Sequence, residues 1–96
     1  MAIASFSDSA TEIFFIHGKT RKGLGWASLG RIVKRKLDMI DYAARLDDLK
    51  SPPGNQLEAL RGELKGWHSI RVNERWRIRF ICSKDGAQKV RVDDYH

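Results

Sequence analysis

The chain has 96 residues and a formal net charge of +6 at pH 7, with a sequence pI near 9.8. This length suits one domain, residues 1–96, with a modest core, and it excludes a second domain. No apolar run is long enough to cross a membrane, and the first residues lack the charged leader and apolar core of a secretion signal. We therefore expect a cytoplasmic protein with an anionic partner and no membrane partner.

Residues 2–6 are predicted to form a short first strand. Ser9 and Glu12 then have the spacing of a capping box, in which the hydroxyl and the carboxylate bind exposed backbone amides. This spacing predicts a short helix, and Gly18 is placed to end it.

A second, longer amphipathic helix is predicted from about Trp26 to Arg45, because apolar residues recur there at helical spacing. It lies within a basic stretch, residues 19–36, that contains no acid. The exposed cations of this helix could simply keep it soluble. Because a second basic region lies in the C-terminal third, we favour nucleic-acid binding, and the predicted substrate-binding residues of the helix are Arg31, Lys34 and Arg35.

The segment Ser51-Pro52-Pro53-Gly54-Asn55 ends the helical half, since neither proline can donate a backbone hydrogen bond. The leucines that follow are predicted to anchor the core, and two glycines are predicted to allow bends around the neighbouring basic residues. These residues are Leu57, Leu60 and Leu64, and Gly62 and Gly66.

Alternating apolar and polar residues predict two strands around residues 69–80, joined by a turn. A two-residue turn would place Ile70 opposite Arg77, whereas a three-residue turn at 73–75 places Ile70 opposite Ile78. We choose the three-residue turn because it pairs apolar with apolar. With a third strand at 88–94, one sheet face is then apolar and the other carries Arg71, Arg77, Arg79 and Arg91. The single cysteine, Cys82, is in phase with the apolar face and is predicted to be a buried structural thiol.

Three segments stand within this order of elements: Leu57 to Gly62, Trp76-Arg77-Ile78, and the ending Asp94-Tyr95-His96. Together with the layout, which covers nearly the whole chain, they resemble the HigB-type toxins of the RelE/ParE superfamily. The resemblance implies an α+β, RelE-like fold in the order β-α-α-β-β-β. Two N-terminal helices would pack on a mainly antiparallel sheet.

The resemblance also implies a function and partners. The protein would be the toxin of a type II toxin–antitoxin system and a ribosome-dependent mRNA endoribonuclease. It would enter the A site of the 70S ribosome, formed by ribosomal RNA, cleave translated messenger RNA and inhibit translation. Its partner would be a HigA-type helix-turn-helix antitoxin, through which the toxin–antitoxin complex would bind operator DNA.

Five active-site residues follow from the resemblance: Asp94, Tyr95 and His96 at the ending, the basic Arg61 and the strand residue Arg77. The chain also departs from the family pattern. Some members have a histidine-proline pair where this chain has Glu58-Ala59, and a lysine where it has Arg61. Arg61 keeps the positive charge, whereas Glu58 could act as a base but not as a cation.

These residue types can cut RNA without a metal ion or cofactor, because the ribose 2′-hydroxyl is itself the nucleophile. A histidine such as His96, with an unperturbed pKa near ~6.5, is the best general acid–base candidate, and Asp94 could orient it. Tyr95 could stack on a base or bind a phosphate. Arginines would neutralise the phosphate in the transition state, with Arg61 and Arg77 leading and Arg71 and Arg79 in support. The three histidines and one cysteine show no metal-ligand spacing.

Two competing functions remain open. A ParE-like toxin would poison DNA gyrase without cutting nucleic acid, and the Asp-Tyr-His ending argues against it. A non-catalytic nucleic-acid-binding module needs only the basic charge, and His96 would then be a solvent-exposed chain end. Replacing His96 with alanine separates catalysis from binding, because it should abolish cleavage and barely alter charge-driven binding.

Overall fold

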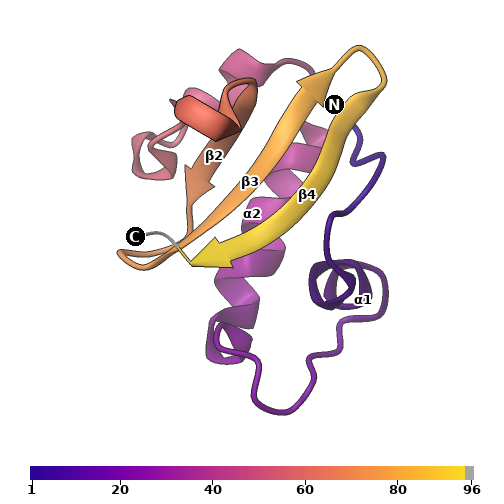
Figure 1. The fold of residues 1–96 in the computed structure, drawn as a ribbon. Helices are drawn as coiled ribbons and strands as arrows, with labels where there is room; N and C mark the ends of the chain where they lie inside the picture. The colour runs from indigo at the N-terminus through magenta and orange to yellow at the C-terminus, as the bar shows by residue number, and fades with distance from the viewer. Residues whose placement is uncertain (95–96) are drawn as a thin grey trace.

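Two helices cover one face of a four-stranded antiparallel sheet in the computed structural model, which describes residues 1–94 (Figure 1). The arrangement confirms the predicted α+β class. The sheet has the order β1-β2-β3-β4, so each strand pairs with the next along the chain. The elements are α1 (Ser9–His17), α2 (Gly30–Tyr42), β1 (Glu58–Ala59), β2 (Trp67–Arg71), β3 (Trp76–Ser83) and β4 (Gly86–Asp94).

Helix α1 begins one residue earlier than the capping-box prediction implied. The carboxylate of Asp8, not the hydroxyl of Ser9, caps the helix by accepting a hydrogen bond of 2.9 Å from the backbone N–H of Thr11. The predicted Ser9–Glu12 box is therefore wrong, because an aspartate one position upstream offers both an acceptor and a charge that suits the positive end of the helix. Gly18 ends the helix as predicted.

Helix α2 is shorter than the predicted span of Trp26 to Arg45. The α-helix runs from Gly30 to Tyr42 and is preceded by a 3-10 turn, Ala27–Leu29. Its inward face is fully buried against the apolar face of the sheet, and each such side chain contributes roughly 1.5–3 kcal/mol by leaving water. The fully buried apolar residues of α2 and the sheet are Val33, Leu37 and Ile40, and Ile70, Ile78, Phe80, Ala87 and Val90.

The β2–β3 hairpin has the predicted three-residue turn, with Ile70 opposite Ile78 and Arg71 opposite Arg77. The side chain of Asn73 fixes the turn, because its oxygen accepts hydrogen bonds from the backbone N–H groups of residues 75 and 76. The alternation of apolar and arginine-bearing faces that the sequence predicted is therefore present in these two strands.

The N-terminal segment lies parallel to β4 and touches it at two bridges, Ile3 with Ala87 and Phe6 with Val90. The predicted strand at residues 2–6 is thus reduced to isolated pairings. The reason lies in β4, where two residues, Lys89 and Val90, oppose the single residue Phe80 of β3, and Lys89 takes a left-handed conformation with φ 53°. This bulge interrupts the regular ladder that a continuous strand would need.

One sequence expectation about a single side chain is wrong, and one lysine is buried although nothing in the sequence indicated it. Cys82 is exposed and not buried, because it lies one residue before the end of β3, where its sulfur is 3.5 Å from the sulfur of Met1. Lys36 belongs to the basic stretch but is buried, and its ammonium group donates a hydrogen bond to the side-chain oxygen of Asn55. Burial and the nearby charges of Arg35 and Arg71 lower the pKa of Lys36.

Candidate active site

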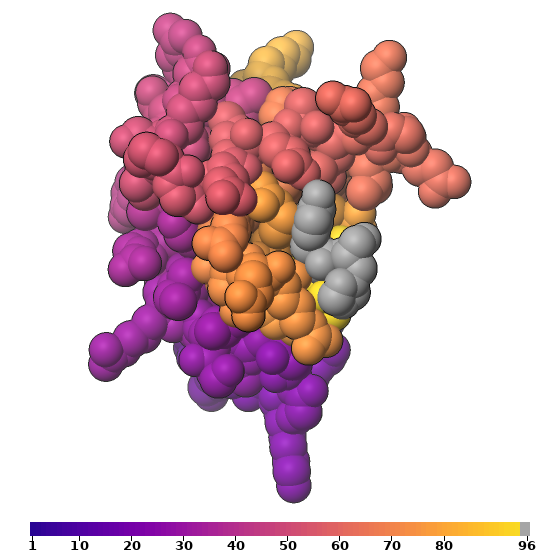
Figure 2. Space-filling model, turned by 90° about the vertical axis from the view of Figure 1, so that its left-hand side faces the viewer, coloured from indigo at the N-terminus to yellow at the C-terminus, as the bar shows by residue number. Residues whose placement is uncertain are grey.

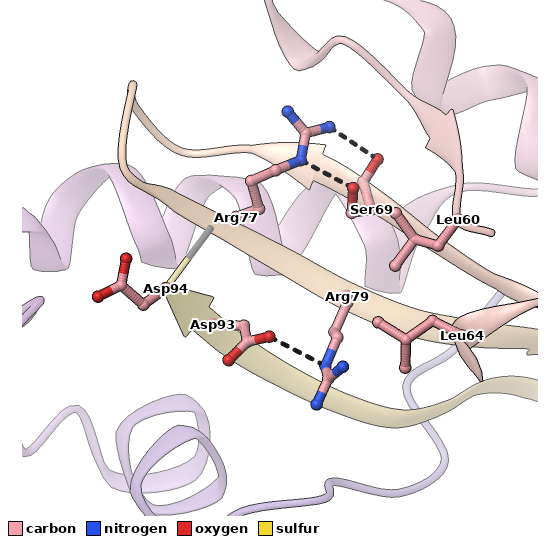
Figure 3. Close-up of a pocket in the computed structure, with 7 residues that line it drawn as sticks. All are labelled: Leu60, Leu64, Ser69, Arg77, Arg79, Asp93 and Asp94. Atoms are coloured by element: carbon pink, nitrogen blue, oxygen red, sulfur yellow. Dashed lines mark hydrogen bonds and ion pairs between the residues drawn. The ribbon is translucent and has the colours of Figure 1, made fainter. Parts of the chain in front are cut away.

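A pocket of about 160 Å³ opens on the face of the sheet opposite the helices. Figure 3 shows its side chains in front of β3 and β4, with α2 behind the sheet. A wider, more open hollow adjoins it, and Leu60 and Leu64 line both spaces. The pocket is lined by Leu60, Leu64, Ser69, Arg77, Arg79, Asp93 and Asp94, and the hollow by Glu58, Ala59, Leu60, Arg61 and Leu64.

Leu60 and Leu64 belong to the segment between β1 and β2, whose salmon-coloured residues lie above the orange residues of β3 and the turn before it in the side view (Figure 2). Gly62 and Gly66 have φ angles of 65° and 97°, so they make the bends that the sequence predicted and bracket Leu64 between them. Leu60 and Leu64 line the pocket and are not among the buried core residues, so the prediction that they anchor the core is wrong. Leu57 does pack against the core.

Arg77 forms one wall of the pocket and is only 6% exposed. Its Nε donates to the hydroxyl of Ser69 at 2.8 Å, and its Nη2 donates to the backbone oxygen of Gln56 at 2.6 Å. These bonds tie β3 to β2 and to the loop before β1. A buried guanidinium held in this way presents its charge to the pocket from a fixed position.

Arg79 and Arg91 also point to this face, but acids accompany them. The Nε of Arg79 lies 3.3 Å from Asp93, and Nη2 of Arg91 lies 3.7 Å from Asp8 and 3.8 Å from Asp93. The guanidinium of Arg79 also stacks over the ring of Trp67, 4.8 Å from its centroid. The arginine-bearing face is therefore close to charge balance around the pocket.

Asp94 ends β4 at the rim of the pocket and is held by Arg75, a residue that the sequence analysis did not select. Arg75 donates to one carboxylate oxygen of Asp94 through Nε at 3.1 Å and Nη2 at 2.8 Å. This contact raises the pKa of Arg75, first through the hydrogen bond and then through the charge. The strand register could have indicated this contact, because the three-residue turn places Arg75 next to Trp76, and Trp76 pairs with Asp94.

The comparisons with known proteins bear on this site. A family model described as the RelE-like toxin of type II toxin–antitoxin system HigB matches residues 4–96. The chain belongs to this family. Its antitoxin partner follows from that membership, since a type II toxin is paired with a protein antitoxin.

Individual relatives agree with the family match. The HigB-1 toxin of Vibrio cholerae is 44% identical over 75 residues, which are 78% of each chain. A protein named endoribonuclease HigB, from Proteus vulgaris, is 32% identical over 94 residues, covering 98% of this chain and 99% of the relative. An uncharacterized protein of Haemophilus influenzae is 31% identical over 90 residues, covering 94% of this chain and 88% of the relative.

The fold of this HigB-family toxin brings together some of the predicted site residues and separates others. Arg77, Arg79 and Asp94 line the pocket, and Arg61 is exposed in the adjoining hollow beside Glu58. Arg71 lies opposite Arg77 in the hairpin. Tyr95 and His96 lie outside the described residues, so their predicted roles stay predictions.

The predicted substrate-binding residues of α2 are on the other side of the sheet from the pocket, because α2 covers the apolar face (Figure 1). Arg31 and Arg35 are exposed, and Lys34 pairs with Asp38 at 2.6 Å while its ammonium lies over the ring of Phe15. The fold therefore places these cations on a different surface of the molecule from the pocket.

Among residues 1–94, no three histidine, cysteine, aspartate or glutamate side chains gather in a way that could hold a metal ion. Within the same range, none of the helices has the length and apolar content needed to cross a bilayer.

Proposed function

We propose that this toxin is an endoribonuclease that cuts messenger RNA in the ribosomal A site, without a metal ion or cofactor, and so inhibits translation. The name of the Proteus vulgaris relative, endoribonuclease HigB, supports the nuclease activity, and that protein aligns over nearly its full length. The proposed partners are the 70S ribosome with its message and a HigA-type antitoxin, through which the complex would bind operator DNA.

One structural observation carries the proposal: β4 ends at Asp94 in the rim of the pocket whose wall contains Arg77, next to the hollow with Arg61. Tyr95 and His96 follow Asp94 directly in the chain. A phosphate in the hollow would therefore meet the charge of Arg61 near Asp94, the residue that precedes Tyr95 and His96 in the chain.

The chemistry assigns a role to each group. The ribose 2′-hydroxyl attacks the adjacent phosphorus and releases a 5′-hydroxyl, leaving a 2′,3′-cyclic phosphate. His96 acts as the general acid–base group, which takes a proton from the 2′-hydroxyl or gives one to the leaving 5′-oxygen. Asp94 orients the imidazole of His96, and Tyr95 stacks on a base or binds phosphate. Arg61 stabilises the charge on the phosphate, and Arg77 adds positive potential from the buried wall.

The ribosome would supply alignment. In-line attack requires the 2′-oxygen, the phosphorus and the leaving oxygen to be held in one geometry, and such positioning can contribute a large part of the rate. In the described part of the site, Asp94 is paired with Arg75 and Arg79 with Asp93, so a message held bent in the A site would supply the alignment that these groups do not.

The test is primer extension on messenger RNA held in programmed ribosomes, with a ribosome-free control. Replacing His96→Ala should lower cleavage about 10²- to 10⁴-fold, the usual contribution of a general acid–base group. His17→Ala is the matched control, because His17 is an exposed histidine at the end of α1 and should leave cleavage unchanged.

A codon-positioned cut that disappears with His96 and persists without His17 supports the nuclease. Absence of any cut by the unmodified toxin would sink the proposal and move the assignment to gyrase poisoning or simple binding.

A further inference from the structure

We propose that the pocket beside the Arg79–Asp93 pair binds one guanine base of the message, so that the toxin reads a base as well as a phosphate. The inference rests on the proposed function and deepens it, because it assigns the substrate group that the pocket accepts. It makes Asp93 a specificity-determining residue.

The size and walls of the pocket suit a base and not a whole nucleotide. Its volume of about 160 Å³ is well below the ~300–1,000 Å³ of a pocket for a drug-sized ligand. Leu60 and Leu64 supply apolar walls, against which the faces of a planar ring can pack. The open hollow with Arg61 is lined by the same two leucines, so a base and its phosphate could occupy neighbouring spaces.

The charges in the pocket argue against a phosphate there. Asp93 and Asp94 both line it, and their carboxylates would repel a phosphate. Asp93 also neutralises Arg79 across 3.3 Å. A neutral base that both donates and accepts hydrogen bonds fits an acid beside an arginine better than an anion does.

The arginine is held where it can act on a base. Stacking on Trp67 keeps the guanidinium plane of Arg79 in place while its buried Nε faces Asp93 at 3.3 Å, so the terminal N–H groups are the ones that a base would meet. Single-stranded RNA bases are commonly recognised by stacking on such planes and by hydrogen bonds to their Watson–Crick edges.

Guanine matches this set of groups best. Only guanine has two adjacent N–H donors on its Watson–Crick edge, N1 and N2, which one carboxylate can accept together. Its O6 acceptor stands beside them, where an arginine can donate. Adenine and cytosine each set a lone pair beside their single amino group, and uracil flanks its one N–H with two carbonyls, so each would place a lone pair against the carboxylate.

The experiment measures cleavage of programmed ribosomes carrying a set of A-site codons that differ in one base at a time. The unmodified toxin should prefer guanine at one codon position by about tenfold or more, within the discrimination that a good bidentate contact gives. Asp93→Asn should reduce this preference to about threefold or less, because an amide cannot accept from both N–H groups.

Asp85→Asn is the matched control, because it removes the same charge from an exposed turn between β3 and β4 and should keep the preference. Leu64→Phe is a second variant that fills the pocket and leaves every charge in place, and it too should lose the preference. Circular dichroism of each variant shows whether it is folded, so the result from Leu64→Phe decides if Asp93→Asn does not fold.

Several outcomes would overturn the inference: no guanine preference in the unmodified toxin, a preference that survives Asp93→Asn, or an equal gain in cleavage of every codon. The last result would mean that Asp93 only shields Arg79 and Arg91 from phosphate.

If the unmodified toxin cuts no programmed ribosome, the proposed function fails, and NMR titration with GMP and AMP decides the inference separately. Larger shifts with GMP at Leu64 and Arg79, lost in Asp93→Asn, would uphold the base site. Equal shifts, or none, would overturn it.

Discussion

The pocket face of the sheet and the outer side of α2 are both rich in cations, but they hold them differently. On the sheet, Arg79 is paired with Asp93 and Arg75 with Asp94. On α2, Arg31 and Arg35 are exposed and take part in no ion pair among residues 1–94. The exposed arginines of α2 therefore carry positive charge on the side of the sheet away from the pocket.

This difference follows from backbone geometry. In a sheet, diagonal neighbours on adjacent strands are about 7–8 Å apart, within reach of a long side chain, so Asp93 on β4, which lies opposite Arg77, reaches Arg79 on β3. On a helix, neighbours on one face are three or four residues apart, and α2 offers Asp38 to Lys34 at that spacing. We infer two roles: α2 attracts RNA over a distance, and the pocket region recognises it at contact.

The largest expected effect is a loss of cleavage when the exposed cation of the hollow, Arg61, is removed, compared with removal of an exposed cation elsewhere. Arg61→Ala should slow single-turnover cleavage on programmed ribosomes about 10²-fold, because one group that stabilises transition-state charge is lost. The free energy of unfolding in urea should change by less than about 0.5 kcal/mol, since Arg61 is exposed. Arg45→Ala, which removes an exposed arginine paired with Asp47, should change neither quantity. Equal loss of cleavage in both variants would contradict the separation.

The next effect tests whether the buried arginine of the pocket supports the fold as well as the site. Arg77→Ala would leave the hydroxyl of Ser69 and the backbone oxygen of Gln56 without this donor, so the free energy of unfolding should fall by about 1–3 kcal/mol. Arg35→Ala, on the exposed side of α2, should stay within about 0.5 kcal/mol of the unmodified protein. Urea unfolding measures both, and similar stability of the two variants would refute the distinction.

The sequence predicted the parts of the fold that depend on periodicity. Ile70 and Ile78 were placed opposite each other because apolar residues pair across a hairpin, and the structure has that register. The end of α1 at Gly18 was likewise visible. Leu60 and Leu64 were misplaced, because a leucine beside a glycine bend gives no periodic signal and only the tertiary arrangement decides which space it lines.

The candidate site was predictable in residue type more than in environment. Arg77 and Arg79 were selected correctly as residues of one face, but alternation cannot show that Arg77 is buried against Ser69 or that Asp93 neutralises Arg79. Those contacts depend on which strand lies beside which. The α2 cations were grouped with the site because charge alone carries no information about the side of the sheet on which a helix packs.

A smaller effect concerns the α2 side as an electrostatic surface. Replacing Arg31, Lys34 and Arg35 together with alanine should weaken ribosome binding and flatten its dependence on salt. Each lost phosphate contact lowers the slope of log affinity against log salt by about 0.7–0.9. The cut position should not move. Binding titrations across a salt series measure the slope, with Lys84→Ala on the β3–β4 turn as the control. An altered codon position would mean that α2 contributes to recognition at contact.

The smallest effect distinguishes the buried lysine of α2 from its exposed neighbours. In the folded protein, burial and the charges of Arg35 and Arg71 lower the pKa of Lys36. In the unfolded chain the pKa of a lysine is near ~10.4, so the folded protein releases this proton at a lower pH than the unfolded chain does. Between the lowered pKa and ~10.4 the unfolded state binds more protons, and stability must therefore rise with pH across that window.

Lys36→Met removes this titration, so the free energy of unfolding of the unmodified protein should rise relative to that of the variant as pH increases through the window. The relative gain is complete above the unfolded pKa and is lost as pH falls through the folded one. Urea unfolding of both proteins from neutral to alkaline pH measures the difference, and Lys50→Met, at an exposed lysine, should run parallel to the unmodified protein. A parallel profile for Lys36→Met as well would show that its ammonium group is as well solvated as the cations on the outer side of α2.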